Sequence, residues 1–282
     1  SISSRDRKEV GAVTWSECIY EYDGSFSGLL CCIFDSYTRK ERPVSILETG
    51  REQISLYAVH TVETDKGHAK RIWNSVCARS AATAKLIRRS HLTCLPNREL
   101  RIYRLVCRLY REGPSFVRNP ADPDLYPLYS AVRHMGTELE KLRGFVRFSE
   151  FEGLYAAEIA PKNRVLPALR HHFCERFADQ DFLIYDRTHK EALVHCHGHW
   201  IITPLDSYTM ARPGRAETAF RRLWKTFYDA IAIRERTNLR CQRSNLPLCY
   251  RSDMTEFQDE SYFQVEDELP PVPNAPSLPR TD

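Results

Sequence analysis

The chain has 282 residues, of which 42% are hydrophobic and 28% are charged, and its formal net charge is +4. A chain of this length buries enough surface for one large domain or two small ones. No apolar run approaches the ~20 residues that a membrane-spanning helix needs, and no secretory leader is evident at the start, so we expect no membrane partner.

The charges are distributed unevenly along the chain. Residues 252–282 carry eight acidic groups against Arg280 alone, whereas residues 1–251 carry 40 basic and 29 acidic groups. A basic body with an acidic tail predicts a polyanionic partner and a tail that competes for the same surface. The alternative is that the charges serve only solubility.

The ten cysteines predict reduced thiols rather than disulfides. Cys31 and Cys32 are adjacent, and no CxxC pair occurs. This usage is typical of a cytoplasmic protein. The cysteine spacing also argues against an iron–sulfur cluster, and the sequence lacks a GxGxxG motif, a P-loop, a GxSxG motif and an HExxH motif. We therefore predict no cofactor.

The N-terminal part begins with a strand and turn at Tyr20–Ser25, and Ser25 is placed to cap a helix. Residues 43–49 predict an extended segment, and a second helix begins after Thr64 or Asp65. Basic side chains near a helix N-terminus oppose its dipole, so their presence there hints at a bound anion, although a solvated face is the default. These side chains are Lys66, Lys70 and Arg71.

A third helix, residues 98–111, carries four arginines at steps of three and four residues. One interpretation is a ridge that follows a phosphate backbone. The other is that the arginines pair with acidic neighbours such as Glu99 and Glu112. The ridge consists of Arg101, Arg104, Arg108 and Arg111.

Residues 113–127 are rich in Pro, Asp and Asn and predict a loop. It separates a mostly helical region, 1–112, from an α+β region, 128–257. A helix is predicted at 128–142 and another at 165–177, and between and after them lie short apolar runs with a hairpin signal. We therefore expect an α+β fold in which helices pack on an antiparallel sheet. The predicted strands are 145–148, 154–159, 182–185, 192–195 and 200–203.

Two groups of polar residues in this region are candidate sites. His172 and Arg176 share a helix face, and Asp186 at a strand end is placed to orient Arg176 or Arg187 by a bidentate pair, which makes a catalytic or phosphate-binding group. The alternative is a structural role for His172. His195, His197 and His199 alternate along one predicted strand and form a weaker candidate for a metal site; the alternative is that they border a turn at Gly198.

The predicted nucleic-acid contacts also include basic residues nearer the C-terminus. Arg147 and Arg187 lie beside predicted strands, and Arg234 and Arg236 lie on an amphipathic helix at 217–236. The segment 258–282 is acidic and then Pro-rich, with too few apolar residues to form a core, so it is predicted to be disordered.

Several motifs together resemble one protein family. They include YDGSFSGLL at 22–30, TDKGHAKRIW at 64–73, GFVRF at 144–148, FLIYDR at 182–187 and LWKTFYDAIAIRERTN at 223–238. The sequence resembles bacterial proteins described as putative DNA metabolism or DNA repair proteins and defined by a domain of unknown function. The Pro-rich tail and the segment CHGHW, residues 196–200, are not part of that pattern.

The resemblance implies a setting rather than a reaction. Members of this family accompany a radical S-adenosylmethionine protein that repairs or modifies DNA, and a similar domain occurs fused to uracil-DNA glycosylase-like proteins. The resemblance thus predicts a DNA-binding accessory protein with DNA and a radical S-adenosylmethionine protein as partners. A DNA-processing enzyme and a protein-interaction scaffold are the alternatives, so whether the chain is an enzyme stays open.

Overall fold

The structure, a computed structural model, describes residues 15–50, 56–119, 121–151 and 154–207, together with Tyr250 and Met254. The predicted helix at 217–236, with Arg234 and Arg236, and the predicted tail at 258–282 lie outside the described residues.

The chain forms two compact units. Unit 1 comprises Ser1–Glu140 and Lys162–Val165, and unit 2 comprises Lys141–Pro161 and Leu166–Asp282. The predicted loop at 113–127 therefore lies within unit 1.

Unit 1 contains a three-stranded parallel sheet in the order β2-β1-β3. The predicted strand and turn at 20–25 and the predicted extended segment at 43–49 contribute to this sheet, but the expectation of a mostly helical region did not include a sheet here. Helix α1 leads from β1 to β2, as two neighbouring parallel strands require a crossover. The elements are β1 (Ser16–Tyr22), α1 (Phe26–Arg39), β2 (Glu41–Glu48) and β3 (Ala58–Thr61).

Helix α1 begins where the sequence predicts. The Ser25 hydroxyl accepts a hydrogen bond from the Gly28 amide at 2.9 Å, which confirms the predicted cap. The Asp23 carboxylate accepts hydrogen bonds from the Ser25 amide and from the Thr64 hydroxyl, each at 2.9 Å. The short motif YDGS therefore fixes the start of α1 and ties it to the segment that follows β3.

Two further helices, α2 and α3, are joined by a single residue. Asp65 caps α2 by accepting from the His68 amide at 2.7 Å. Ser80 ends α2, donating its amide to the Val76 carbonyl at 2.9 Å, and its hydroxyl accepts from the Thr83 amide at 3.1 Å to start α3. The bounds are α2 (Lys66–Arg79) and α3 (Ala81–Ser90).

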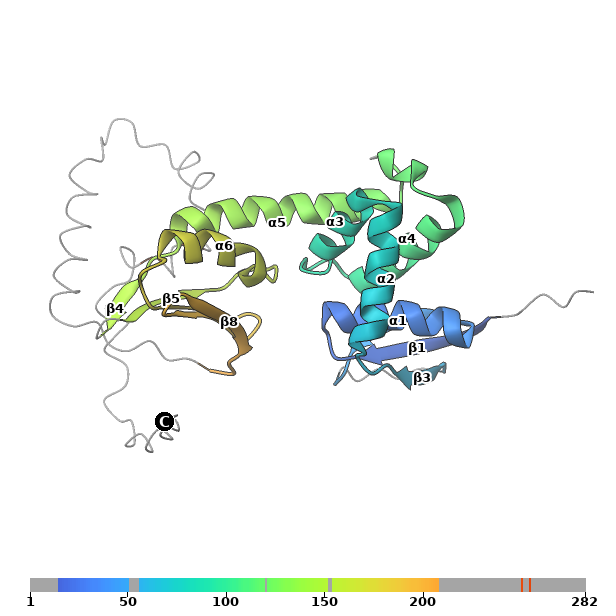
Figure 1. Cartoon of the computed structure of the whole chain (residues 1–282), viewed down its shortest axis with the longest axis horizontal. Coiled ribbons are helices and arrows are strands. Elements are labelled where there is room, and N and C mark those ends of the chain that lie inside the picture. Colours follow the sequence, from blue (N-terminus) through green and yellow to red (C-terminus); the bar gives the residue numbers. More distant parts are fainter. Residues whose placement is uncertain are drawn as a thin grey trace, which may run out of the picture. The chain divides into compact units, whose positions relative to one another are not determined.

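The remaining helices of unit 1 complete its core. They are α4 (Arg98–Glu112), a 3-10 turn (Ser115–Arg118) and most of α5 (Leu125–Phe145), which continues into unit 2. Buried residues of α1, α2, α3 and α4 pack with Cys18, Tyr20 and Tyr22 of β1, so the helices cover one face of the sheet (Figure 1). Segment 162–165 returns to this unit, where Arg164 donates its amide to the Leu92 carbonyl at 2.9 Å.

Unit 2 contains a five-stranded mixed sheet in the order β4-β5-β6-β7-β8. The pairs β4–β5, β6–β7 and β7–β8 are antiparallel, as predicted, while β5–β6 is parallel because α6 connects them. The α+β fold is confirmed. The elements are β4 (Ser149–Phe151), β5 (Leu154–Ile159), α6 (Leu166–Arg176), β6 (Phe182–Asp186), β7 (Glu191–Cys196) and β8 (His199–Pro204).

The predicted strand at 145–148 is wrong. Helix α5 continues through Gly144 to Phe145, and the Val146 amide donates to the Leu142 carbonyl at 3.0 Å, so the hairpin begins only at Ser149. No helix of the described residues combines the length and the apolar character that crossing a membrane requires.

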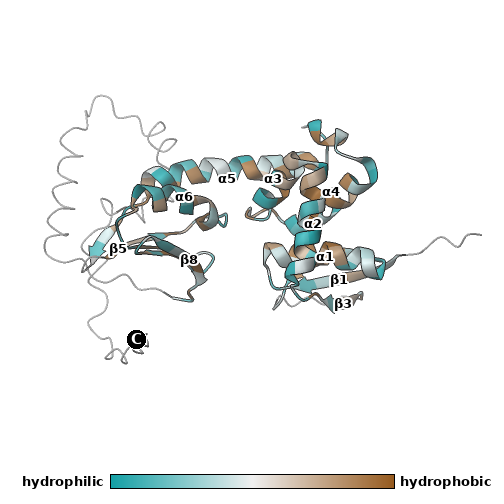
Figure 2. Cartoon of the chain, in the orientation of Figure 1, coloured by the Kyte–Doolittle hydropathy of each residue, from teal (hydrophilic) through white to brown (hydrophobic). Residues whose placement is uncertain are grey.

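Helix α2 is more hydrophilic than α1. Figure 2 shows that much of the α2 ribbon is hydrophilic, whereas α1 carries hydrophobic stretches.

Candidate nucleic-acid interface

The helix pair α2–α3 carries positive charge only. Between Lys66 and Ser90 the sequence contains seven Lys or Arg residues and no Asp or Glu. Such a run concentrates an electrostatic potential that attracts polyanions. We call these residues the basic surface: Lys66, Lys70, Arg71, Arg79, Lys85, Arg88 and Arg89.

The basic surface is presented to solvent. Six of its members are exposed, and Arg89 is half-buried. The opposite sides of both helices face the core and supply buried residues such as Ile72, Val76 and Ile87. Within the described part of the chain, no carboxylate pairs with any of the seven. Their charges are therefore not neutralised locally, which distinguishes them from Arg39, Arg98, Arg108 and Arg111 of the same unit.

Aromatic rings support three of these arginines. The guanidinium carbon of Arg79 lies 4.7 Å from the Tyr110 ring centroid, and that of Arg88 lies 5.8 Å from the ring of Trp73. Arg71 lies 6.0 Å from Phe34. A guanidinium held against a ring keeps N–H groups at its edge that can donate to a phosphate.

A groove adjoins the basic surface at Arg89. Its volume is about 840 Å³, and it runs along α5, where Tyr126 is 58% exposed. Gly136 lies beside Arg89, and a Cβ there would meet Arg89 Nη2 at 3.8 Å, an ordinary van der Waals distance. Tyrosine rings beside arginines suit stacking and phosphate contact with unpaired nucleotides. The lining residues include Arg89, Tyr126, Tyr129, Arg133, Gly136 and Glu140.

The structure divides the predicted arginine ridge on α4, because Arg108 and Arg111 pair with carboxylates, as the alternative interpretation expects. This guanidinium contacts Glu112 at 2.8 Å, Asp122 at 2.9 Å and Asp124 at 3.1 Å. Although burial opposes ionisation of Asp122, hydrogen bonds from the Asp124 amide and Arg108 lower its pKa. Arg111 pairs with Glu112 at 2.8 Å. These ion pairs occupy two of the four arginines of the ridge.

We predict that Arg108→Gln lowers the melting temperature more than Arg104→Gln. The first change leaves Asp122 and Asp124 without the cation that they contact and leaves Glu112 with Arg111 alone, whereas Arg104 is exposed. Thermal unfolding followed by circular dichroism measures both variants. Equal melting temperatures would show that the three carboxylates do not depend on Arg108.

The other predicted basic contacts are scattered. Arg101 is half-buried, Arg147 donates to the Gly144 carbonyl at 2.8 Å, and Arg187 pairs with Glu158 at 2.8 Å. Of the predicted contacts that the structure describes, Lys66, Lys70 and Arg71 are the ones that belong to the basic surface.

The predicted convergence of His172, Arg176 and Asp186 does not occur through Asp186. That carboxylate is fully buried and accepts from the amides of Thr188 and His189 at 3.0 and 3.1 Å. It also contacts the His189 ring at 2.7 Å. Asp186 therefore holds the turn between β6 and β7, and the predicted pairing with Arg176 or Arg187 is wrong.

The predicted histidine strand is divided by a turn. His197 and Gly198 both have positive φ, 49° and 77°, as a two-residue hairpin between β7 and β8 requires. His195 is buried, bonds the Gln180 carbonyl at 2.9 Å and stacks on Phe182. His195, His197 and His199 therefore do not lie in a row on one strand, and the alternative of a turn around Gly198 is correct.

The turn instead groups His197 with Asp181 and Cys196. The Asp181 carboxylate accepts from the His197 amide at 2.8 Å and contacts the Cys196 thiol at 3.4 Å. Asp181 thus holds the hairpin, which explains the cluster without a ligand.

The sequence interpretation missed four members of the basic surface: Arg79, Lys85, Arg88 and Arg89. The signal that identifies them is the absence of any acidic residue from Lys66 to Ser90, rather than a spacing within one helix.

The model of a domain of unknown function, DUF4130, matches residues 96–256, more than half of the chain. The chain belongs to the DUF4130 family. The predicted resemblance to a family defined by a domain of unknown function is thereby confirmed.

Further comparison adds no relative with an assigned activity. Neither the search of curated proteins nor the search of solved structures returned a match. The basic surface and the motif YDGSFSGLL precede the range that the DUF4130 model covers.

Proposed function

We propose that this DUF4130 protein binds DNA through the basic surface of α2–α3 and acts as an accessory protein in DNA repair or modification. The observation that carries the proposal is the run of seven exposed or half-exposed basic residues with no acidic residue among them. Binding of phosphates to such side chains releases condensed counterions, which drives association with DNA.

The groove on α5 favours DNA with unpaired bases. Tyr126, which is 58% exposed, is the ring on which a base can stack, and the half-buried Tyr129 lines the groove with Arg89 and Arg133. Stacking of a base on an aromatic side chain contributes ~1–3 kcal/mol irrespective of the base. A lesion-bearing or partly opened duplex provides both a phosphate backbone and an accessible base.

The biological setting of the proposal comes from the family resemblance. The resemblance supports DNA repair or modification together with a radical S-adenosylmethionine protein. The cysteine usage supports a cytoplasmic location. An activity of its own on DNA remains the alternative, with His172 and Arg176 as its candidate residues.

The test measures affinity for fluorescently labelled single-stranded and duplex DNA across a salt series. The basic-surface variant replaces Lys70, Arg71, Lys85 and Arg88 by Gln. Each lost phosphate contact should reduce the slope of log affinity against log salt by about 0.7–0.9. We therefore expect the slope to fall by roughly three units.

The control variant removes the same charge elsewhere in unit 1, by replacing Arg42, Arg104, Arg111 and Arg118 with Gln. These four side chains are exposed, so the fold should tolerate the change. Equal slopes for the two variants, or no salt-dependent binding by the unaltered protein, would overturn the proposal. Poly-glutamate that competes as well as DNA of equal charge would favour the acidic-protein scaffold instead.

A further inference from the structure

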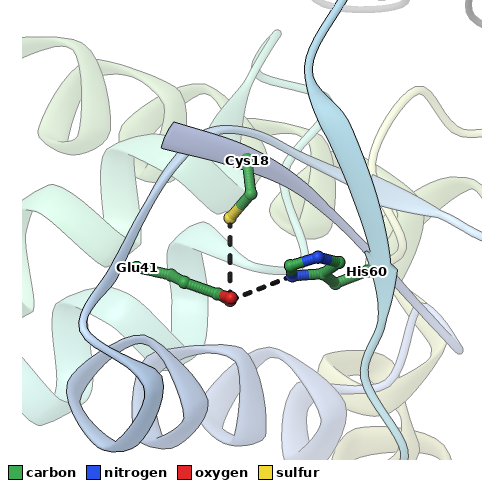
Figure 3. Close-up of side chains that lie close together, drawn as sticks. All are labelled: Cys18, Glu41 and His60. Atoms are coloured by element: carbon green, nitrogen blue, oxygen red, sulfur yellow. Dashed lines mark hydrogen bonds and ion pairs between the residues drawn. The ribbon is translucent and has the colours of Figure 1, made fainter. Parts of the chain in front are cut away.

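A cluster of three different metal-binding side chains lies in the three-stranded sheet of unit 1. Cys18 comes from β1, Glu41 is the first residue of β2, and His60 comes from β3. The pairing of Ser16 with Glu41 and of Tyr20 with His60 places all three on the face that bears Cys18 and Tyr20. Figure 3 shows their polar atoms pointing toward one another.

The distances suit a tetrahedral ion. The Glu41 Oε2 atom lies 3.1 Å from His60 Nδ1 and 3.9 Å from Cys18 Sγ, and all three ligand atoms lie within 4.8 Å of one another. A zinc ion with bonds of about 2.0–2.3 Å separates its ligands by roughly 3.3–3.8 Å. Small side-chain movements therefore suffice to create a site with three protein ligands and one open position.

The surroundings also suit a cation. Cys18 is 1% exposed and Glu41 8%, while the His60 side chain is 34% exposed and marks the side from which an ion enters. The Tyr20 hydroxyl donates to Glu41 Oε2 at 2.8 Å, an interaction that would orient the carboxylate from outside the ligand set. A divalent ion with one thiolate, one carboxylate and a neutral imidazole has no net charge, which reduces the cost of burying it.

We propose that Cys18, Glu41 and His60 bind one zinc-type divalent cation that links β1, β2 and β3. The softness of the thiolate with the imidazole selects zinc or cobalt over magnesium or calcium. Because β3 is an edge strand of four residues, a ligand from each strand would hold it in place. This inference does not depend on DNA binding.

The experiment uses the full chain without a histidine tag, stripped of metal by a chelator and then titrated with Co²⁺ and Zn²⁺. We expect one Co²⁺ per chain with a thiolate-to-cobalt absorption band, its displacement by Zn²⁺, and a Zn²⁺-dependent rise in melting temperature of several degrees. His60→Ala and Cys18→Val should each abolish the band. His60 is the safer position for the fold because its side chain is partly exposed.

Two control variants test whether the cobalt band and the thermal shift come from this site. Cys94→Ser removes an exposed thiol of unit 1, and Cys196→Ser removes the thiol beside Asp181 and His197; both variants should keep the band and the thermal shift. The proposal is overturned if the unaltered chain binds no stoichiometric metal. It is equally overturned if the band is lost in Cys196→Ser and kept in His60→Ala.

Discussion

Alanine at position 28 should lower the free energy of unfolding by about 2–3 kcal/mol. Gly28 lies in the first turn of α1, and a Cβ there would be 2.3 Å from Asp23 Oδ1, 2.8 Å from Thr64 Oγ1 and 2.9 Å from a Tyr22 ring carbon. The Asp23 carboxylate must move, and its hydrogen bonds to Ser25 and Thr64 weaken. This loss exceeds the gain of ~1 kcal/mol that alanine brings to a helix.

Gly136→Ala is the matched control. Gly136 also lies within a helix, but the nearest atom to a Cβ there is Arg89 Nη2 at 3.8 Å, so we expect a gain of up to ~1 kcal/mol. Urea unfolding followed by circular dichroism measures both variants. If both shifts have the same sign and size, the packing around Gly28 is looser than the structure indicates.

The second large effect is an acid-dependent loss of stability caused by His91. This side chain is 4% exposed, and burial, with the charges of Arg98 and Arg164, lowers its pKa to about 3. An unfolded histidine has a pKa near 6.5, so the unfolded chain binds the additional proton as the pH falls below that value. Between pH 7 and pH 5 this group alone should reduce the free energy of unfolding by about 2 kcal/mol.

Comparison with His91→Gln isolates the effect. The variant starts less stable, but only the change between pH 7 and pH 5 is compared. Carboxylates whose pKa is lowered in the fold, such as Asp23 and Asp122, contribute mainly at more acidic pH. The unaltered protein should lose ~2 kcal/mol more than the variant over this interval. Parallel losses would mean that His91 accepts a proton in the folded state.

Elements with local signals could be predicted from the sequence. Ser25 and Asp65 cap helices because their side chains bond amides three residues on, and the apolar stripe of residues 98–111 gives α4. Strand β3 carries no such signal. Its four residues are a strand only because they pair with β1, about 40 residues earlier in the chain.

The sites were harder to predict for a similar reason. Spacing shows that Arg101, Arg104 and Arg108 share a helix face, but the loop residues Asp122 and Asp124 decide whether Arg108 is available. Likewise, the sequence predicts that His195 and His199 lie on one strand, and only the positive φ values of His197 and Gly198 show that a turn separates them. The basic surface depended least on tertiary contacts, because no acidic residue lies between Lys66 and Ser90 and no carboxylate of the described residues pairs with it.

The junction at Ser80 has a consequence for recognition. Since one residue both ends α2 and starts α3, there is no linker in which the two helices can bend independently. The distances between charges on the two helices then depend on the backbone angles of this one residue and on the packing of both helices against the core. A partner whose negative groups repeat at a different interval satisfies fewer of these charges at once. Selectivity among polyanions would then come from the periodicity of the partner's backbone, without any contact to a base edge.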